Sequence, residues 1–112
     1  MPVDVLNKDA LLARVGGDAA LLGAMAALFL EECPAYLDGV REAVARHDAP
    51  ALERTAHALK GSVSNFMAPA AVQAALTLEL MGRAGDLTGA EQALLDLESA
   101  VERLTPALKE FT

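Results

Sequence analysis

An all-α fold, an antiparallel four-helix bundle with a short additional N-terminal helix, is predicted from three features of this sequence. Hydrophobic residues make up 54% of the 112 residues, whereas aromatic residues make up only 4%. This composition, dominated by Ala and Leu, favours closely packed helices over a β-sandwich. Apolar residues also recur with a helical period in segments that carry start or stop signals. Four long segments with short connections between them are typical of a bundle.

The first two helices are predicted at residues 8–15 and 18–46, within a single domain of residues 1–112. Asn7 and Asp18 are their expected N-caps, because short polar side chains accept hydrogen bonds from the first free N–H groups. The short first helix is expected to lie across one end of the bundle as a lid. Pro34 lacks a backbone donor, so it is expected to kink or loosen the second helix.

The remaining helices are predicted at residues 48–66, 69–84 and 88–104. Asp48 is the expected N-cap of the third helix. For the last helix, the spacing of Thr88 and Glu91 predicts a capping box. Thr105 and Pro106 are expected to interrupt this helix, with a further turn or two after them.

The charge and the few metal-binding residue types exclude several classes of function. A net charge of −7 argues against nucleic-acid binding, which requires a basic surface. Two histidines and one cysteine, without an H-x-x-x-H or C-x-x-C pair, make a metal site unexpected. The single Cys33 cannot form an internal disulfide, so we expect a cytoplasmic location.

No membrane association is expected from the hydropathy of the chain. No uninterrupted apolar run approaches the roughly 20 residues that span a bilayer. The longest run, Ala24–Leu30, is followed by Glu31 and Glu32. The first residues also lack the positive region and the apolar core of a signal peptide.

A stripe of apolar residues runs along the predicted third helix. Wound at about 100° per residue, the stripe falls within about 40° of one direction. It consists of Leu52, Ala56, Leu59, Val63 and Phe66. His57 lies about 140° from that direction, among polar residues, so its ring is expected on the solvent side. A histidine in a helix is more often an ordinary surface or core residue, and its neighbours must decide between the two interpretations.

Two neighbours of His57 indicate a chemical role. Gly61 costs about 1 kcal/mol relative to Ala in a helix. Because a helical side chain covers the turn before its own Cα, a side chain at position 61 would lie over the ring, whereas glycine gives steric access. Lys60 is one turn from His57 and is expected to stabilise the charge of an anion held there. This arrangement suits phosphoryl transfer to and from a ring nitrogen.

The segment HALKGS, from His57 to Ser62, resembles the H-x-L-K-G-S signature of histidine-containing phosphotransfer (HPt) domains of bacterial phosphorelays. The resemblance covers nearly the whole chain. The segments DALLARVGGDAALL, REAVARHDAPALERTAHALKGS and AGDLTGAEQALLDLE look like this family in order and spacing. The resemblance implies a four-helix bundle with an exposed active histidine in the middle of a helix.

The same resemblance implies that His57 accepts a phosphoryl group from a receiver-domain phospho-aspartate and passes it to another receiver aspartate. Such a protein is a phosphohistidine carrier and not an ATP-dependent kinase. Its expected partners are response-regulator receiver domains and a hybrid sensor histidine kinase, which could be its parent chain. No cofactor is expected in this chain, because Mg²⁺ would be held by the carboxylates of the receiver.

In this family a Gln or Glu on the fourth helix orients the histidine ring, and the matching residue here is Glu79. Winding the fourth helix places Val72, Leu76 and Leu80 on its core face, with Glu79 at the border. The resemblance implies that the carboxylate fixes the tautomer of the ring and stabilises its phosphorylated form. The alternative is a solvated surface acid paired with Arg83.

The chain departs from the family pattern after SNF, where NFMA replaces the usual NFGA. If this position requires φ > 0, Met67 costs roughly 1–2 kcal/mol relative to glycine. We expect receivers to dock on a patch around the motif. Its expected contributors are Ala58, Gly61, Ser64 and Met67, with Val63 at the edge.

Two other functions remain open at this level. An HPt-like adaptor would bind a receiver or kinase without transferring phosphate, and Met67 is the sequence feature that supports it. A plain structural bundle would leave Gly61 unexplained. We expect a monomer, and either a free protein or an excised part of a hybrid kinase is compatible with the sequence.

Overall fold

A computed structural model describes residues 6–112, and all regular elements in that range are α-helices. The helices are α1 (Lys8–Arg14), α2 (Ala19–Ala45), α3 (Ala49–Ser64), α4 (Pro69–Ala84) and α5 (Ala90–Lys109). The predicted all-helical class is confirmed. The bounds of the first four helices differ from the predicted ones by at most two residues, as at the end of α3, which is Ser64 instead of residue 66.

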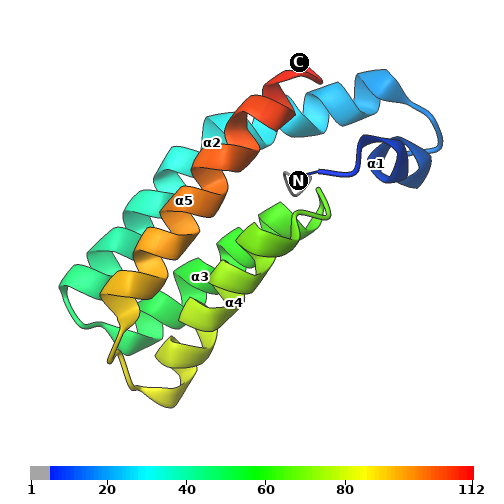
Figure 1. The fold of residues 1–112 in the computed structure, drawn as a ribbon. Coiled ribbons are helices and arrows are strands. Elements are labelled where there is room, and N and C mark those ends of the chain that lie inside the picture. Colours follow the sequence, from blue (N-terminus) through cyan, green and yellow to red (C-terminus); the bar gives the residue numbers. More distant parts are fainter. Residues whose placement is uncertain (1–5) are drawn as a thin grey trace.

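The four long helices pack in a ring (Figure 1). α2 and α4 do not pack against each other, and each lies between α3 and α5. The short α1 packs against α2 and lies at the end of the molecule where the C-terminus is found. That it covers this end as a lid stays a prediction. An ion pair between Lys8 and Glu110 joins α1 to the end of α5.

Three helices begin at the predicted caps. The side chains of Asn7, Asp18 and Asp48 each accept a hydrogen bond from a backbone N–H of the first turn. The predicted capping box of α5 is wrong. The N-cap of α5 is Gly89, which has a left-handed backbone, and the N–H of Thr88 is bound by Asp86 in the preceding loop.

The predicted interruption at Pro106 is also wrong, because α5 continues to Lys109. Leu104 and Leu108 lie on either side of the proline and are both fully buried. Burying both leucines in one core requires helical spacing between them, and this outweighs the hydrogen bond that proline cannot make. α2 likewise continues through Pro34, and it bends along its length in Figure 1.

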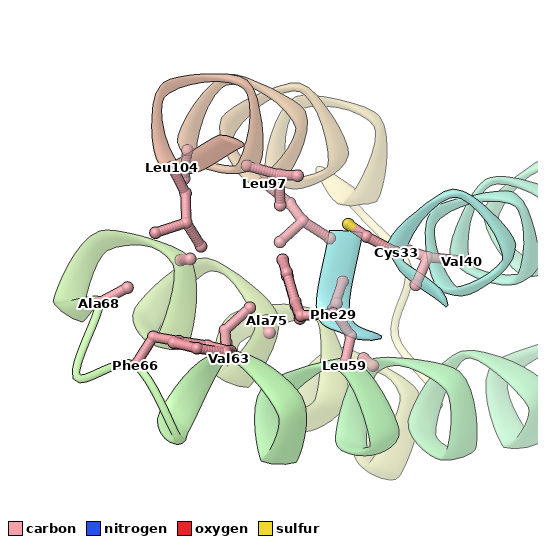
Figure 2. Packing of buried hydrophobic residues seen from close by; sticks show 14 of the residues in the cluster. Phe29, Cys33, Val40, Leu59, Val63, Phe66, Ala68, Ala75, Leu97 and Leu104 are labelled. Atoms are coloured by element: carbon pink, nitrogen blue, oxygen red, sulfur yellow. The ribbon is translucent and has the colours of Figure 1, made fainter. Parts of the chain in front are cut away.

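The core lies between the four long helices (Figure 2). The apolar stripe predicted for α3 is confirmed, since Leu52, Ala56, Leu59, Val63 and Phe66 are at most 2% exposed. At one end of the core the rings of Phe29 and Phe66 pack edge to face with centroids 5.4 Å apart. Because Val63 is completely buried, its predicted place at the edge of a docking surface is wrong.

The predicted core face of α4 requires a correction. Leu80 is 47% exposed, and Val72 and Leu76 are only half-buried. The buried residues of α4 are Ala71, Ala75, Leu78, Glu79 and Gly82. The large aliphatic residues suggested the wrong face, because α4 approaches its neighbours through its small residues.

Gly82 marks the closest approach of α4 to α3. A Cβ atom at this position would lie 2.5 Å from the backbone nitrogen of Glu53 and 2.7 Å from the carbonyl oxygen of Ala49. Both are backbone atoms, which cannot move aside as the tip of a side chain can. The absence of a side chain at residue 82 therefore sets the spacing of the two helices.

By length and composition, α2 is the one helix within residues 6–112 that could cross a membrane. An 18-residue window in it has a mean hydropathy of 1.4. The sequence prediction considered uninterrupted apolar runs only, whereas this criterion tolerates charges such as those of Glu31 and Glu32. Mostly buried helices of globular proteins pass the same test, but only 22% of this window is buried. α2 contributes to the core of this bundle, and the predicted lack of membrane association stays a prediction.

A matched pair of glycine variants tests the helix spacing. Gly82→Ala is expected to lower the free energy of unfolding by about 2 kcal/mol, because the new methyl group overlaps with backbone atoms of α3. Gly61→Ala is expected to raise it by about 0.5–1 kcal/mol, because a Cβ there meets no atom within 4 Å and alanine is the better helix former. Urea unfolding measures both, and a Gly82→Ala protein as stable as the parent would contradict the steric argument.

Candidate functional site

The ring of His57 lies on the open side of α3. Its side chain is 67% exposed, in agreement with the winding of the helix, while its neighbour Ala56 is completely buried. The helix therefore presents the imidazole to solvent from a rigid element of the core. With its side chain exposed, the ring is accessible to a reacting group from another molecule.

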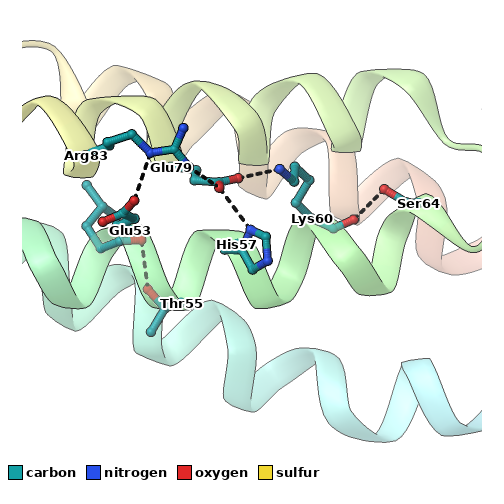
Figure 3. A network of polar contacts seen from close by, with 8 residues as sticks. Glu53, Thr55, His57, Lys60, Ser64, Glu79 and Arg83 are labelled. Atoms are coloured by element: carbon teal, nitrogen blue, oxygen red, sulfur yellow. Dashed lines mark hydrogen bonds and ion pairs between the residues drawn. The ribbon is translucent and has the colours of Figure 1, made fainter.

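Glu79 of α4 holds one nitrogen of this ring (Figure 3). The Nδ1 atom of His57 lies 2.9 Å from the Oε2 atom of Glu79. Sequence reasoning placed Glu79 at the border of the core, but the residue is only 1% exposed, which makes it the one buried charged residue among residues 6–112. An ionised carboxylate at such a depth requires positive charge or hydrogen-bond donors around it.

Two basic side chains compensate this carboxylate. Nζ of Lys60 lies 2.6 Å from Oε1, and Arg83 donates to Oε2 over 3.0 Å. The lysine contact is an ion pair at hydrogen-bond distance, so the positive charge of Lys60 lies directly on Oε1. Lys60 contributes most to lowering the pKa of Glu79, followed by His57, and together they outweigh the rise that burial causes. Glu79 is therefore ionised at neutral pH.

The ionised state of Glu79 determines the tautomer of His57. A carboxylate has no hydrogen to donate, so the neutral ring must carry its hydrogen on Nδ1 to bond with Oε2. Nε2 then has a free lone pair, and it is the nitrogen that points away from Glu79 in Figure 3. The arrangement leaves a nucleophile on the exposed side of the ring.

The surface beside the ring is open and made of small side chains. Ala58, Gly61 and Ser64 are exposed, and the Ser64 hydroxyl donates to the carbonyl oxygen of Lys60 over 2.7 Å. A Cβ atom at Gly61 would meet nothing within 4 Å, and its φ is not positive. Neither packing nor backbone conformation within residues 6–112 therefore requires a glycine there, in contrast to Gly82.

Met67 has a positive φ, the condition under which the sequence analysis expects a methionine to be costly at this position. Its φ is 52°, in the left-handed region, and its side chain is 44% exposed. His47 has the same φ of 52° and lies just after the end of α2, close to the predicted helix terminus. Met67 therefore carries local strain of roughly 1–2 kcal/mol at the end of the helix that bears His57.

Sequence reasoning did not foresee the role of Glu53. This residue of α3 accepts a hydrogen bond over 2.9 Å from Nε of Arg83, whose other donor binds Glu79. The pairing of Glu79 with Arg83 was expected only if Glu79 were a solvated surface acid, whereas here Glu79 is paired with Arg83 and is also buried. The spacing of four residues between Glu53 and His57 places both on adjacent turns, but it does not identify the partner on α4.

Beyond the geometry, comparison with known protein families decides the assignment. The family model of the Hpt domain matches residues 16–107. The chain belongs to the Hpt domain family. The matched range of this Hpt domain contains α2, α3 and α4 completely and most of α5, but not α1. No significant match was found among curated proteins or among solved structures.

Membership in the Hpt family implies histidine-mediated phosphotransfer in phosphorelays. His57 lies within the matched range, as do Lys60, Gly61 and Glu79. Within residues 6–112 there is no group of three or more His, Cys, Asp or Glu residues that could hold a metal ion.

The lowered pKa of Glu79 predicts a pH-dependent contribution to stability. A group with a depressed folded-state pKa stabilises the fold above its ordinary pKa of 4.5 and loses this effect as the pH falls through the folded-state value. The stability difference between the parent and Glu79→Gln is therefore expected to be largest at neutral pH and to shrink below pH 4.5. Urea unfolding between neutral and acidic pH measures it, and a difference independent of pH would refute the assignment.

Proposed function

We propose that this Hpt domain is a phosphorelay intermediate with His57 as its phosphoryl carrier. The residue accepts a phosphoryl group from a receiver-domain phospho-aspartate and passes it to another receiver aspartate. An antiparallel four-helix topology is part of this proposal, and the ring of helix contacts and the short connections support it. The exposed ring, held by an ionised carboxylate so that Nε2 faces solvent, is the observation that carries the proposal.

The proposed step is a displacement at phosphorus. The Nε2 lone pair of His57 forms the N–P bond while the bond from phosphorus to the aspartyl oxygen breaks, and the aspartate leaves as a carboxylate. Nδ1 keeps its hydrogen, so the phosphorylated ring becomes positively charged. The carboxylate of Glu79 stabilises that charge from 2.9 Å. Transfer to the next receiver is the reverse of this step.

Lys60 is proposed to stabilise the charge of the transferring group. Its side chain is 26% exposed, so it is partly accessible from the open face of α3. In the unphosphorylated protein its ammonium lies on Oε1 of Glu79. Lys60 would therefore have to exchange partners when the phosphoryl group arrives.

The proposed docking surface surrounds the open face of α3. Ala58, Gly61, Ser64 and Met67 are its proposed members on and after α3. A cleft of about 120 Å³ between α2 and the end of α3 continues this surface. Its lining includes Leu28, which is 57% exposed. Small residues beside the ring and an apolar area next to it suit a partner that brings its own acidic site close.

The partner classes follow from the proposed step. We propose response-regulator receiver domains and a hybrid sensor kinase, with Mg²⁺ bound by the carboxylates of the receiver and not by this chain. A cytoplasmic monomer agrees with this role. The alternative is an adaptor that binds a receiver without accepting phosphate, and the strained, exposed Met67 is the feature that favours it.

The carrier role predicts phosphorylation of one of the two histidines. When the domain is mixed with receivers of the source organism that have been phosphorylated beforehand, acid-labile and base-stable phosphate is expected on the parent protein and on His47→Gln. No such label is expected on His57→Gln. His47 is a matched control because it is also exposed but lies after α2. Receiver binding without labelling would favour the adaptor, and label on His57→Gln would refute the site.

Access to the ring is tested at Gly61. Gly61→Arg is expected to slow transfer by about tenfold or more, because a long side chain at this position covers the turn that bears His57. Gly61→Ala is the control and should transfer at nearly the parental rate, since a methyl group there meets nothing. Stopped-flow or rapid-quench measurement of phosphate loss from the receiver gives both rates. Full activity of Gly61→Arg, with unchanged helicity, would contradict the argument about access.

A further inference from the structure

Glu79 is compensated by two cations that bind different oxygens. Nζ of Lys60 lies 2.6 Å from Oε1, and Nη2 of Arg83 lies 3.0 Å from Oε2. Oε2 also accepts a hydrogen bond from the Nδ1–H group of His57. The charged and titratable groups around this carboxylate are Glu53, His57 and Lys60 from α3 and Arg83 from α4. One oxygen thus connects the ring to Arg83, and the other connects to Lys60 (Figure 3).

The two cations are held in different ways. Arg83 is bound at two points, because its Nε donates to Glu53 over 2.9 Å while its Nη2 donates to Glu79. The planar guanidinium fits such a pair of carboxylates with little loss of freedom for each bond. Lys60 has a single contact, made by a point charge at the end of a flexible stem. Arg83 is thus held at two points and Lys60 at one, although the side chain of Arg83 is the more exposed of the two, at 59% against 26%.

Phosphorylation of His57 would separate these two cations. A phosphoryl group brings nearly two negative charges, and Nε2 lies on the far side of the ring from Glu79 (Figure 3). Lys60 lies three residues after His57, a spacing that places side chains of one helix next to each other. Its ammonium would be attracted away from Oε1. Arg83 is on the other helix and bound by Glu53, so it would stay on Oε2.

We propose that Arg83, anchored by Glu53, is a positioning residue that keeps Glu79 ionised and bonded to His57 while Lys60 moves to the phosphoryl group. The inference rests on the proposed carrier function. Without Arg83, the departure of Lys60 would leave the phosphorylated ring as the one remaining cation among these groups, and the negative phosphoryl group on that ring would favour protonation of the buried carboxylate. With Arg83 in place, one cation is exchanged and the other remains. The phosphorylated ring therefore keeps its negatively charged partner.

Carboxyl NMR of Glu79 tests this inference in both states of His57. Phosphoramidate serves as the phosphoryl donor, so the test does not require a receiver. In Arg83→Gln, the pKa of Glu79 is expected to rise by about one unit once His57 is phosphorylated and by clearly less before phosphorylation, when Lys60 still compensates it. The ¹⁵N spectrum of His57 should show a weakened hydrogen bond from Nδ1–H to Glu79 in phosphorylated Arg83→Gln only.

Two further variants separate positioning from general stability. Arg41→Gln removes an arginine that also binds two acids, Asp38 and Glu98, on α2 and α5, and it should leave the Glu79 titration unchanged. Arg83→Lys keeps the charge and should restore most of the parental titration. Equal shifts in both phosphorylation states, no shift at all, or an Arg83→Lys protein that behaves like Arg83→Gln would overturn the proposal. If phosphoramidate phosphorylated His57 but receivers did not, the carrier function would be rejected, and the positioning role of Arg83 could still be tested.

Discussion

A negative charge lies in the seam between α3 and α4, and much of the surrounding structure compensates it. An ionised carboxylate removed from water is destabilising by several kcal/mol unless opposite charges and donors surround it. Glu79 obtains them from His57 and Lys60 on one helix and from Arg83 on its own helix. Because the donors come from both helices, the register of α3 against α4 and the orientation of the ring depend on each other. If α3 slid along α4, Glu79 would lose the charge of Lys60, and the hydrogen bond that fixes the tautomer of His57 would also be lost.

This dependence explains how an exposed histidine can be chemically defined. A surface imidazole would normally rotate and exchange its hydrogen between two nitrogens. Here one nitrogen is fixed by a buried acid while the other remains in solvent. The chain thus presents an oriented imidazole on a packed helix, and in the proposed function the rest of the active site comes from the partner. The open surface around Gly61 fits this division, since no intramolecular contact requires a glycine there.

Sequence patterns predicted local features well and contacts between helices less well. The caps at Asn7, Asp18 and Asp48 depend on neighbouring backbone groups, and they were found as expected. The face of α4 was misassigned because burial follows the available space between helices, which Ala75 and Gly82 fit and the larger Leu80 does not. The continuation of α5 beyond Pro106 depends on the burial of Leu108, a tertiary effect that overrides the local preference of proline.

The residues of the candidate site could be predicted from the sequence, but the burial of Glu79 could not. The motif around His57 and the position of Glu79 came from the family resemblance, and the exposure of the ring came from helical geometry. The burial of Glu79 and the link from Glu53 through Arg83 depend on the distance between α3 and α4, which no local pattern encodes.

That distance is set where the backbone of α3 meets Gly82, one turn from Glu79. A methyl group there would lie 2.5 Å from a backbone nitrogen of α3, so the two helices would have to move apart and the contacts of Glu79 with α3 would lengthen. Gly82 lies outside the polar network around His57, yet the orientation of the ring depends on it through the position of Glu79.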